Sequence, residues 1–224
     1  MNYQKQLDSI LSQIVSENKE EAETCGKLKR LYLHSCCAPC SSYVLEYLSE
    51  YFAITVFYYN PNISFAQEYH KRVEEQKRLI AAFNESGVGY PIQIEEGEYE
   101  PECFYEIARG LETCPEGGER CFKCFDLRLR KTAQRAAEGH YDYFTTTLTI
   151  SPLKNAQKLN EIGQKLAIEY QIPWLVSDFK KKNGYKRSVE LSVEHGLYRQ
   201  DYCGCVYSKK QREKEKAGLK SLSE

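Results

Sequence analysis

Hydrophobic positions follow two spacings along this chain, and the two spacings predict different elements. Intervals of three and four residues from Leu7 to Val15 predict an amphipathic helix over about residues 3–17. Short apolar runs, several rich in β-branched and aromatic residues, predict buried strands: LYLHSC (31–36), FAITVFYYN (52–60), PIQIEE (91–96), YDYFTTTLT (141–149) and PWLVSDF (173–179). Longer mixed segments predict helices: 41–51, 65–86, 101–111, 123–139, 154–170, 187–195 and a tail helix from Ser208.

Strands and helices alternate from residue 31 onward, and the strands are apolar on both faces. This pattern is typical of an α/β fold in which a mostly parallel sheet lies between two helical layers, a three-layer sandwich. The lack of an internal repeat favours a single domain over residues 1–224, with its core at about 30–208 and a basic tail at 209–224. Ligands of such sheets bind at the carboxyl ends of the strands. We expect HSCCAPCSS, YYNPN, TTLTISPLK and DFKKKNGY at that edge.

The chain has 224 residues and a formal net charge of −1, so no global charge attracts it to nucleic acid. Its cations are nevertheless clustered, at Lys180–Lys182 and in the terminal SKKQREKEKAGLK. No apolar run reaches the roughly 20 residues of a membrane helix, and the N-terminus is too polar for a signal peptide. We therefore expect a cytoplasmic protein with no membrane partner. In a reducing compartment, ten cysteines at short spacings indicate metal binding or redox chemistry rather than structural disulfides.

The first cysteine group is Cys36, Cys37 and Cys40, at a predicted turn from strand to helix. The positive end of the helix dipole lowers the pKa of thiols placed there. Cys37 and Cys40 have the spacing of a thioredoxin-like pair, so one interpretation is a thiol–disulfide oxidoreductase. That interpretation leaves Cys36 unexplained, and the strand pattern downstream does not favour thioredoxin.

Cys121 and Cys124 form a second pair, near the start of a predicted helix. Two cysteine pairs far apart in sequence commonly bind zinc or an iron–sulfur cluster. Adjacent cysteines such as Cys36 and Cys37 are unusual in structural zinc sites, so the combination favours a cluster. The same thiolates could instead hold zinc tetrahedrally, in a zinc-binding RNA-interaction module without catalysis.

Cys203-Gly204-Cys205 is the third cysteine motif. A disulfide across one intervening residue would be strained and readily reduced, which is typical of catalytic or regulatory disulfides. The alternative is that one or both thiolates coordinate metal. The remaining cysteines have no partner at a diagnostic spacing and are expected to be structural or incidental: Cys25, Cys103 and Cys114.

Taken together, the motifs resemble those of the cobalamin-independent epoxyqueuosine reductases, a QueH-like family. The matching stretches are HSCCAPCSS (34–42), YYNPNI (58–63), PEGGERCFKCFDLRLRKTA (115–133), TTLTISPLKN (146–155), SDFKKKNGYKRSVELS (177–192) and LYRQDYCGCVYS (197–208). They occur in order over most of residues 31–208. Each motif alone is weak, but the set is specific.

The resemblance implies reduction of epoxyqueuosine to queuosine at the wobble position of transfer RNA, with electrons from an unidentified donor. It also implies that Cys203 and Cys205 are redox-active. In some relatives an aspartate occupies the position of Cys40 beside a second metal, so Cys40 is a candidate ligand of a second iron ion. The implied cofactor is a [4Fe–4S] cluster, carried by position onto four cysteines: Cys36, Cys37, Cys121 and Cys124.

The resemblance further implies an adenine nucleotide α-hydrolase-like (HUP-type) fold. Those relatives carry a glycine-rich phosphate loop after the first strand, and HSCCAPCSS takes its place here. The loss of those glycines removes a backbone cradle for phosphate, so we expect no ATP binding.

An anticodon-loop base is recognised by stacking on aromatic side chains and by contacts to nearby phosphates. Tyr185 beside Lys180–Lys182, and Tyr198 beside Arg199, supply both kinds of group near predicted strand ends. Removal of an epoxide oxygen also requires a proton donor. Nearness to the third cysteine motif makes three residues candidates: Tyr198, Asp201 and Tyr202.

Overall fold

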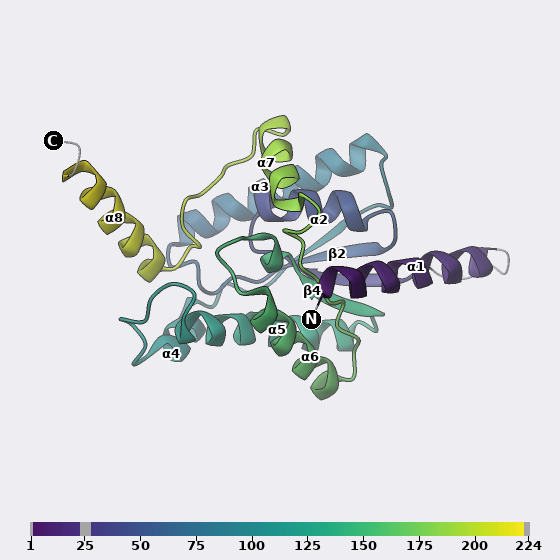
Figure 1. Cartoon of the computed structure of the whole chain (residues 1–224), viewed down its shortest axis with the longest axis horizontal. Helices are drawn as coiled ribbons and strands as arrows, with labels where there is room; N and C mark the ends of the chain where they lie inside the picture. The colour runs from purple at the N-terminus through teal and green to yellow at the C-terminus, as the bar shows by residue number, and fades with distance from the viewer. Residues whose placement is uncertain (1, 23–27, 222–224) are drawn as a thin grey trace.

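Four short parallel strands form the centre of the computed structural model, which describes residues 2–22 and 28–221 (Figure 1). The strands are β1 (Arg30–His34), β2 (Ala53–Tyr58), β3 (Gln93–Glu96) and β4 (Tyr143–Thr146), and they lie in the order β3-β2-β1-β4. β1 is central, with Leu33 opposite Val56 on one side and Thr145 on the other. β1 and β2 are almost wholly buried because both of their faces are covered, which explains their nearly continuous apolar runs.

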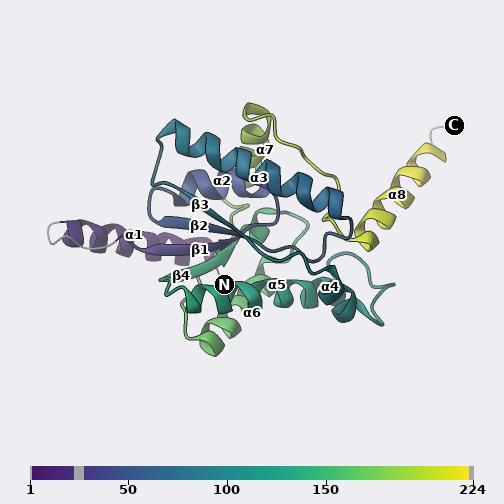
Figure 2. The same ribbon diagram turned by 180° about the vertical axis from the view of Figure 1, so that it is seen from behind.

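Helices cover both faces of this sheet, as Figures 1 and 2 show from opposite sides. One layer holds α2 (Ala38–Leu48), α3 (Ala66–Ser86) and α7 (Gly184–Glu194). The other holds α4 (Pro101–Ala108), α5 (Glu119–Glu138) and α6 (Ala156–Tyr170). The predicted α/β three-layer sandwich is therefore confirmed. Its strand order matches the first four strands of doubly wound sheets, while the HUP-type assignment stays a prediction.

Each face of the sheet has its own apolar core. On the α2 side, Leu33 and Val56 pack with Leu45 and Leu79, and α1 (Tyr3–Ala22) adds residues such as Leu11. On the α5 side, the aromatic core residues include Tyr32, Phe57, Phe125, Phe144 and Trp174. The first helix is thus longer than the predicted 3–17, and its apolar stripe contributes to the main core as expected.

The predicted fifth strand, PWLVSDF, is not a strand. It makes a single parallel bridge to β4, between Trp174 and Phe144. Beyond that point, side chains and not a neighbouring strand form hydrogen bonds with its backbone. The side chain of Asn160 bonds both the amide and the carbonyl of Ser177, and Thr145 Oγ1 donates to the carbonyl of Leu175. The predicted strand at 141–149 likewise ends early, at Thr146, where a 3-10 turn (Thr147–Ile150) begins.

None of the described helices is both long enough and apolar enough to cross a membrane. The two end helices, α1 and α8 (Val206–Ser221), extend from opposite sides of the sandwich (Figures 1 and 2). Cys25 lies outside the described residues, so its expected structural role stays a prediction.

Candidate active site

A cavity of about 300 Å³ opens at the carboxyl ends of β1 and β4. The turn after β1 supplies Cys36, Cys37 and Cys40, and the segment after β4 supplies Ile150–Lys154. The rest of its wall comes from other parts of the chain: Arg72, Glu116, Arg128, Tyr185, Ser188, Arg199, Gln200, Asp201, Tyr202, Cys203 and Arg212. The sheet edge predicted from sequence is therefore where this cavity forms.

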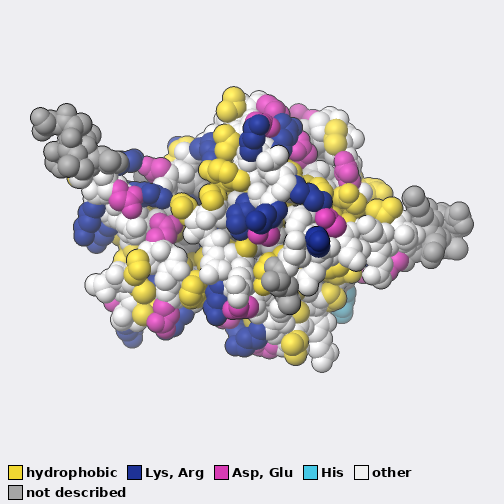
Figure 3. All heavy atoms as spheres, viewed as in Figure 1, with side chains coloured by type: hydrophobic (Ala, Val, Ile, Leu, Met, Phe, Trp, Pro, Cys, Tyr) yellow, Lys and Arg dark blue, Asp and Glu magenta, His cyan; other side chains and the backbone are white. Residues whose placement is uncertain are grey.

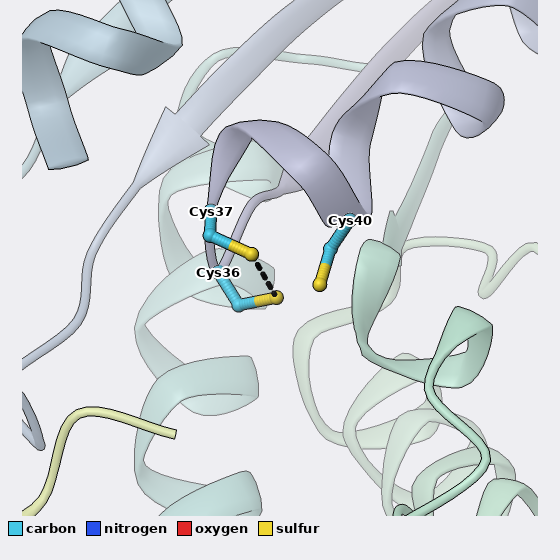
Figure 4. A group of neighbouring side chains, drawn as sticks. All are labelled: Cys36, Cys37 and Cys40. Carbon is cyan, nitrogen blue, oxygen red and sulfur yellow. Dashed lines mark hydrogen bonds between the residues drawn. The ribbon is translucent and has the colours of Figure 1, made fainter. Parts of the chain in front are cut away.

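The three cysteines after β1 point their sulfur atoms toward one another at the start of α2 (Figure 4). All three Sγ atoms lie within 4.8 Å of one another, and those of Cys36 and Cys37 are 3.8 Å apart. Cys37 is the N-cap of α2 and Pro39 lies in its first turn, where a missing N–H costs nothing. The turn thus brings three thiols together at the positive end of a helix.

The pKa values of these three thiols differ. Hydrogen bonds from the Cys37 and Cys40 thiols, which outweigh burial, hold the pKa of Cys36 well below its ordinary value. Donating the bond to Cys36 raises the pKa of Cys37 to about 12, and the pKa of Cys40 is raised as well. The group therefore favours one thiolate, at Cys36, supported by two neutral thiols.

Cys121 and Cys124 lie in the first two turns of α5, beside a smaller cavity of about 30 Å³. Cys203 and Cys205 line the same small cavity, and Cys203 also lines the large one. Burial raises the pKa of Cys121 and raises that of Cys124 to about 11. The structure thus gathers seven cysteines from three motifs around two adjoining cavities, whereas Cys103 and Cys114 line neither.

The predicted ligand set, Cys36, Cys37, Cys121 and Cys124, spans both cavities. Cys36 and Cys37 belong to the close group at the start of α2, and Cys121 and Cys124 to the small cavity beside it. That ligand set stays a prediction.

The Cys203-Gly204-Cys205 turn is held in place by the loop that follows β2. Asn62 Nδ2 donates to the carbonyl of Cys203, and the amide of Ser64 donates to the carbonyl of Gly204. Gly204 has a φ of +117°, and a Cβ there would lie 2.8 Å from Ile63. Only glycine suits this position, because both the backbone angle and the lack of space exclude a side chain.

Within this turn both thiols are free, with their Sγ atoms 3.6 Å apart. The hydrogen bond between the two thiols, which outweighs burial, lowers the pKa of Cys203 to about 6. The same bond raises the pKa of Cys205. The turn therefore presents one thiolate and one thiol, the pairing that thiol–disulfide exchange requires.

Three cations surround the sulfur atoms. Arg128 is 3% exposed and binds the side chain of Asn60, and Arg72 is 2% exposed and donates to the carbonyl of Cys203. Lys154 lines both cavities, and among the described residues no carboxylate pairs with its ammonium group. Burial alone would lower the pKa of Lys154, but the negative charge of the Cys36 and Cys203 thiolates raises it. These cations favour thiolates, and hence metal binding.

Only some of the candidate RNA-binding and proton-donor residues lie at the large cavity. Tyr185 and Arg199 line the large cavity, while Lys180 pairs with Asp178 and Lys182 with Asp8. Lys181 is exposed. The proposed proton donors are Tyr198, Asp201 and Tyr202.

Among those candidate donors, Asp201 and Tyr202 line the cavity, whereas Tyr198 bonds to Glu68. The ion pair with Lys216 lowers the pKa of Asp201, which makes it a carboxylate and a poor proton donor. Sequence reasoning missed Lys154 and Arg128 as cavity cations. The signal for Lys154 was present, because it ends a loop already expected at the carboxyl edge.

The geometry fits a thiolate-bound metal. Four thiolates at about 2.3 Å from a tetrahedral ion stand roughly 3.8 Å from one another, which is the spacing found between Cys36 and Cys37. Iron–sulfur clusters take four cysteine thiolates, and seven cysteines are available here.

Comparisons with known proteins assign the chain to a family. A family model described as "Epoxyqueuosine reductase QueH" matches residues 31–211. The epoxyqueuosine reductase QueH of Streptococcus pyogenes is 49% identical over 180 residues, which are 80% of this chain and 70% of the relative. The relative from Staphylococcus epidermidis is 43% identical, and the match covers 90% of this chain and 83% of the relative. The relative from Thermotoga maritima is 34% identical, and the match covers 84% of this chain and 94% of the relative. The chain therefore belongs to the epoxyqueuosine reductase QueH family.

Proposed function

We propose that this chain is an epoxyqueuosine reductase that forms queuosine at the wobble position of transfer RNA and uses a [4Fe–4S] cluster. The observation that carries the proposal is the meeting of three separate cysteine motifs at two adjoining cavities, in a chain of this family. The proposed cluster ligands are Cys36, Cys37, Cys121 and Cys124. Cys40 adds a third thiolate beside Cys36, and we propose it as a ligand of a second iron ion.

The cavity suits a modified base. Its volume of about 300 Å³ lies at the lower end of the range for small-molecule sites. Tyr185 is 41% exposed at its wall and offers a ring on which a splayed base can stack. Arg199, on the same wall, supplies a cation for a flanking phosphate.

The reaction removes an epoxide oxygen and leaves an alkene, so it consumes two electrons and two protons and releases water. An iron–sulfur cluster, when bound, supplies electrons one at a time and a Lewis-acidic iron. Oxidation of the Cys203 thiolate and the Cys205 thiol to a disulfide would supply two electrons and one proton from within one turn, and the second proton would come from solvent. Lys154 lies between the two cysteine groups, where its ammonium can hold the departing oxygen by charge.

The test begins with iron and sulfide analysis of anaerobically purified protein, followed by assay on transfer RNA carrying epoxyqueuosine. We expect Cys121→Ala and Cys124→Ala each to lose most of the iron and the activity. Cys103→Ala is the matched control, since Cys103 is half-buried but lines neither cavity, and it should keep both. Full iron content in Cys121→Ala would remove that residue from the ligand set.

The same preparation separates the alternatives. A zinc-binding RNA module would be colourless and inactive, whereas a cluster protein is brown. A thiol–disulfide oxidoreductase acting through Cys37 and Cys40 would stay active without metal. The double variant Cys203→Ser/Cys205→Ser should keep its iron yet fail to convert epoxyqueuosine, and loss of the iron would instead make these two residues ligands.

A further inference from the structure

Helix α8 (Val206–Ser221) leaves the body of the molecule at the cavity and extends away from it (Figures 1 and 2). From Ser208 to Lys216 it contains no apolar residue. A helix that is polar on all sides gains no stability from core burial, so its sequence serves some other purpose. Most of it also lies beyond Gln211, where the match to the family model ends.

The first turns of α8 are fixed to the cavity wall. Ser208 donates to Glu116 through its hydroxyl, and the amide of Glu116 donates to the side chain of Gln211. Glu116 lines both cavities. Arg212 lines the large cavity itself, one helical turn farther along α8. The helix therefore begins as part of the active site and carries on outward from it.

One face of α8 is cationic along this path. Lys209, Arg212 and Lys216 are spaced three and four residues apart, which places them on the same side of a helix. Arg212 lines the cavity, and Lys216 pairs with the rim residue Asp201. Lys210 and Lys214 are exposed beside this face, and the dark blue side chains of Figure 3 gather along the helix.

The net charge of this helix contrasts with that of the whole chain. Between residues 209 and 216 there are five cations and two carboxylates, Glu213 and Glu215, in a chain whose formal net charge is −1. Glu215 pairs with Arg212, one of the five cations. Concentrated positive charge on an exposed helix is complementary to the phosphate backbone of nucleic acid. A membrane-surface helix would need a broad apolar face, which residues 208–216 do not have.

We propose that α8 is an RNA-docking arm that follows the phosphate backbone of the anticodon stem-loop away from the cavity. The proposal rests on the proposed function, because the arm is useful only if a transfer RNA base enters the cavity. With a rise of about 1.5 Å per residue, the 16 residues of α8 span roughly 24 Å. The arm thus extends recognition well beyond the reacting base, while the cavity handles the base itself.

The test neutralises three lysines of α8 that line neither cavity, the exposed Lys210 and Lys214 and the half-buried Lys209. The variant is Lys209→Gln/Lys210→Gln/Lys214→Gln, and the probe is an anticodon stem-loop RNA. We expect the dissociation constant to rise about tenfold or more. The slope of log affinity against log salt concentration should become shallower by about 2, because the loss of three phosphate contacts means that binding releases fewer counterions. The KM for transfer RNA should rise with it, whereas kcat at saturation and the iron content should not change.

Two control variants separate charge from structure. Lys209→Arg/Lys210→Arg/Lys214→Arg should retain the parent affinity and salt slope. Lys77→Gln/Lys158→Gln/Lys165→Gln removes the same charge from α3 and α6 and should also have no effect. Unchanged affinity and slope in the glutamine variant of α8 would overturn the arm.

Failure of the arm and failure of the proposed function give different results. If the parent protein does not convert epoxyqueuosine but the α8 glutamine variant weakens RNA binding, the arm stands and the proposed reaction is wrong. If the parent protein converts epoxyqueuosine and the α8 glutamine variant binds RNA as tightly as the parent, the proposed reaction stands and the proposal of an RNA-docking arm is wrong. A variant that loses binding to phosphatidylserine vesicles but not to RNA would also overturn the arm, in favour of a membrane surface.

Discussion

Single residues decide which thiols in this site are reactive. In each of two groups the hydrogen bonds among the thiols favour one thiolate: Cys36 in the first motif and Cys203 in the third. Among the described residues, Cys121 and Cys124 lack such a bond to another thiol, and burial raises their pKa values. Resting protonation therefore does not follow proposed role, because one proposed ligand, Cys36, and one proposed redox residue, Cys203, are both thiolates.

This difference predicts the alkylation of metal-free, reduced protein. The pKa of Cys203 is lowered to about 6, so its thiolate fraction rises through that pH and is nearly complete at pH 7. Iodoacetamide labelling of Cys203, followed by mass spectrometry, should show a midpoint near pH 6, while Cys205 and Cys103 label only at higher pH because their pKa values are raised. Cys205→Ala removes the hydrogen bond between the two thiols and should move the Cys203 midpoint upward. Equal labelling of Cys203 and Cys103 at pH 7 would contradict this assignment.

At the scale of elements, the strand–turn–helix unit from β1 to α2 (Ala38–Leu48) determines what the site can bind. The turn consists of Ser35, Cys36 and Cys37, and it holds thiols where a phosphate loop would need glycines and free backbone N–H groups. The Ser35 hydroxyl is engaged inside the protein by Ser41 and Gln76. This element is therefore built for sulfur chemistry.

We accordingly expect no role for ATP. Conversion of epoxyqueuosine by purified enzyme with a chemical reductant should proceed equally with and without ATP, and calorimetric titration with ATP should show no binding. A strict requirement for ATP in this assay would show that the β1–α2 turn has kept a nucleotide-binding function.

The elements that sequence patterns predicted well are those with a strong, local signal. The sequence predicted the long amphipathic helices α3 and α5 to within a few residues, and also the strands β1 and β2, which are apolar on both faces. In each of them the spacing of apolar residues along the sequence matches the spacing of buried positions in the structure. The prediction of a strand at PWLVSDF was wrong, because backbone groups of this segment form hydrogen bonds with the side chains of Asn160 and Thr145. No local sequence pattern reveals such contacts.

The cysteine motifs were visible in the sequence, but their arrangement in space was not. Cys203 lines both cavities only because the loop after β2 holds its turn, at Asn62 and Ser64. Contacts of that kind join residues about 140 positions apart, and spacing alone does not predict them.

At the scale of the whole molecule, the sheet joins the two cores and carries the site at one edge. β1 contributes Leu33 to one core and Tyr32 to the other. We propose that residues 30–208 form one domain, since both cores share these strands. His34, at the carboxyl end of β1, links the layers through Thr146 and the carbonyl of Tyr59.

The buried histidine predicts how stability depends on pH. Burial, with the nearby charge of Arg128, lowers the pKa of His34 to about 3, against about 6.5 in the unfolded chain. The neutral form stabilises the fold above pH 6.5, and this contribution is lost as pH falls from 6.5 toward 3, at up to about 1.4 kcal/mol per pH unit. The free energy of unfolding, measured by chemical denaturation at several pH values, should fall less steeply in His34→Gln. His70→Gln changes an exposed histidine and should keep the parent slope.

The wide separation of the cavity residues along the chain also bears on how the protein is made. Cys36 emerges early during synthesis, Cys124 in the middle and Cys203 near the end, yet all three belong to the adjoining cavities. Chains fold from the N-terminus as they leave the ribosome. On the proposed ligand set, Cys36 and Cys37 would remain unloaded until Cys124 has emerged, so that cluster loading could begin only after the middle of the chain is made. A chain interrupted before Cys121 would expose the early thiols without the other two proposed ligands.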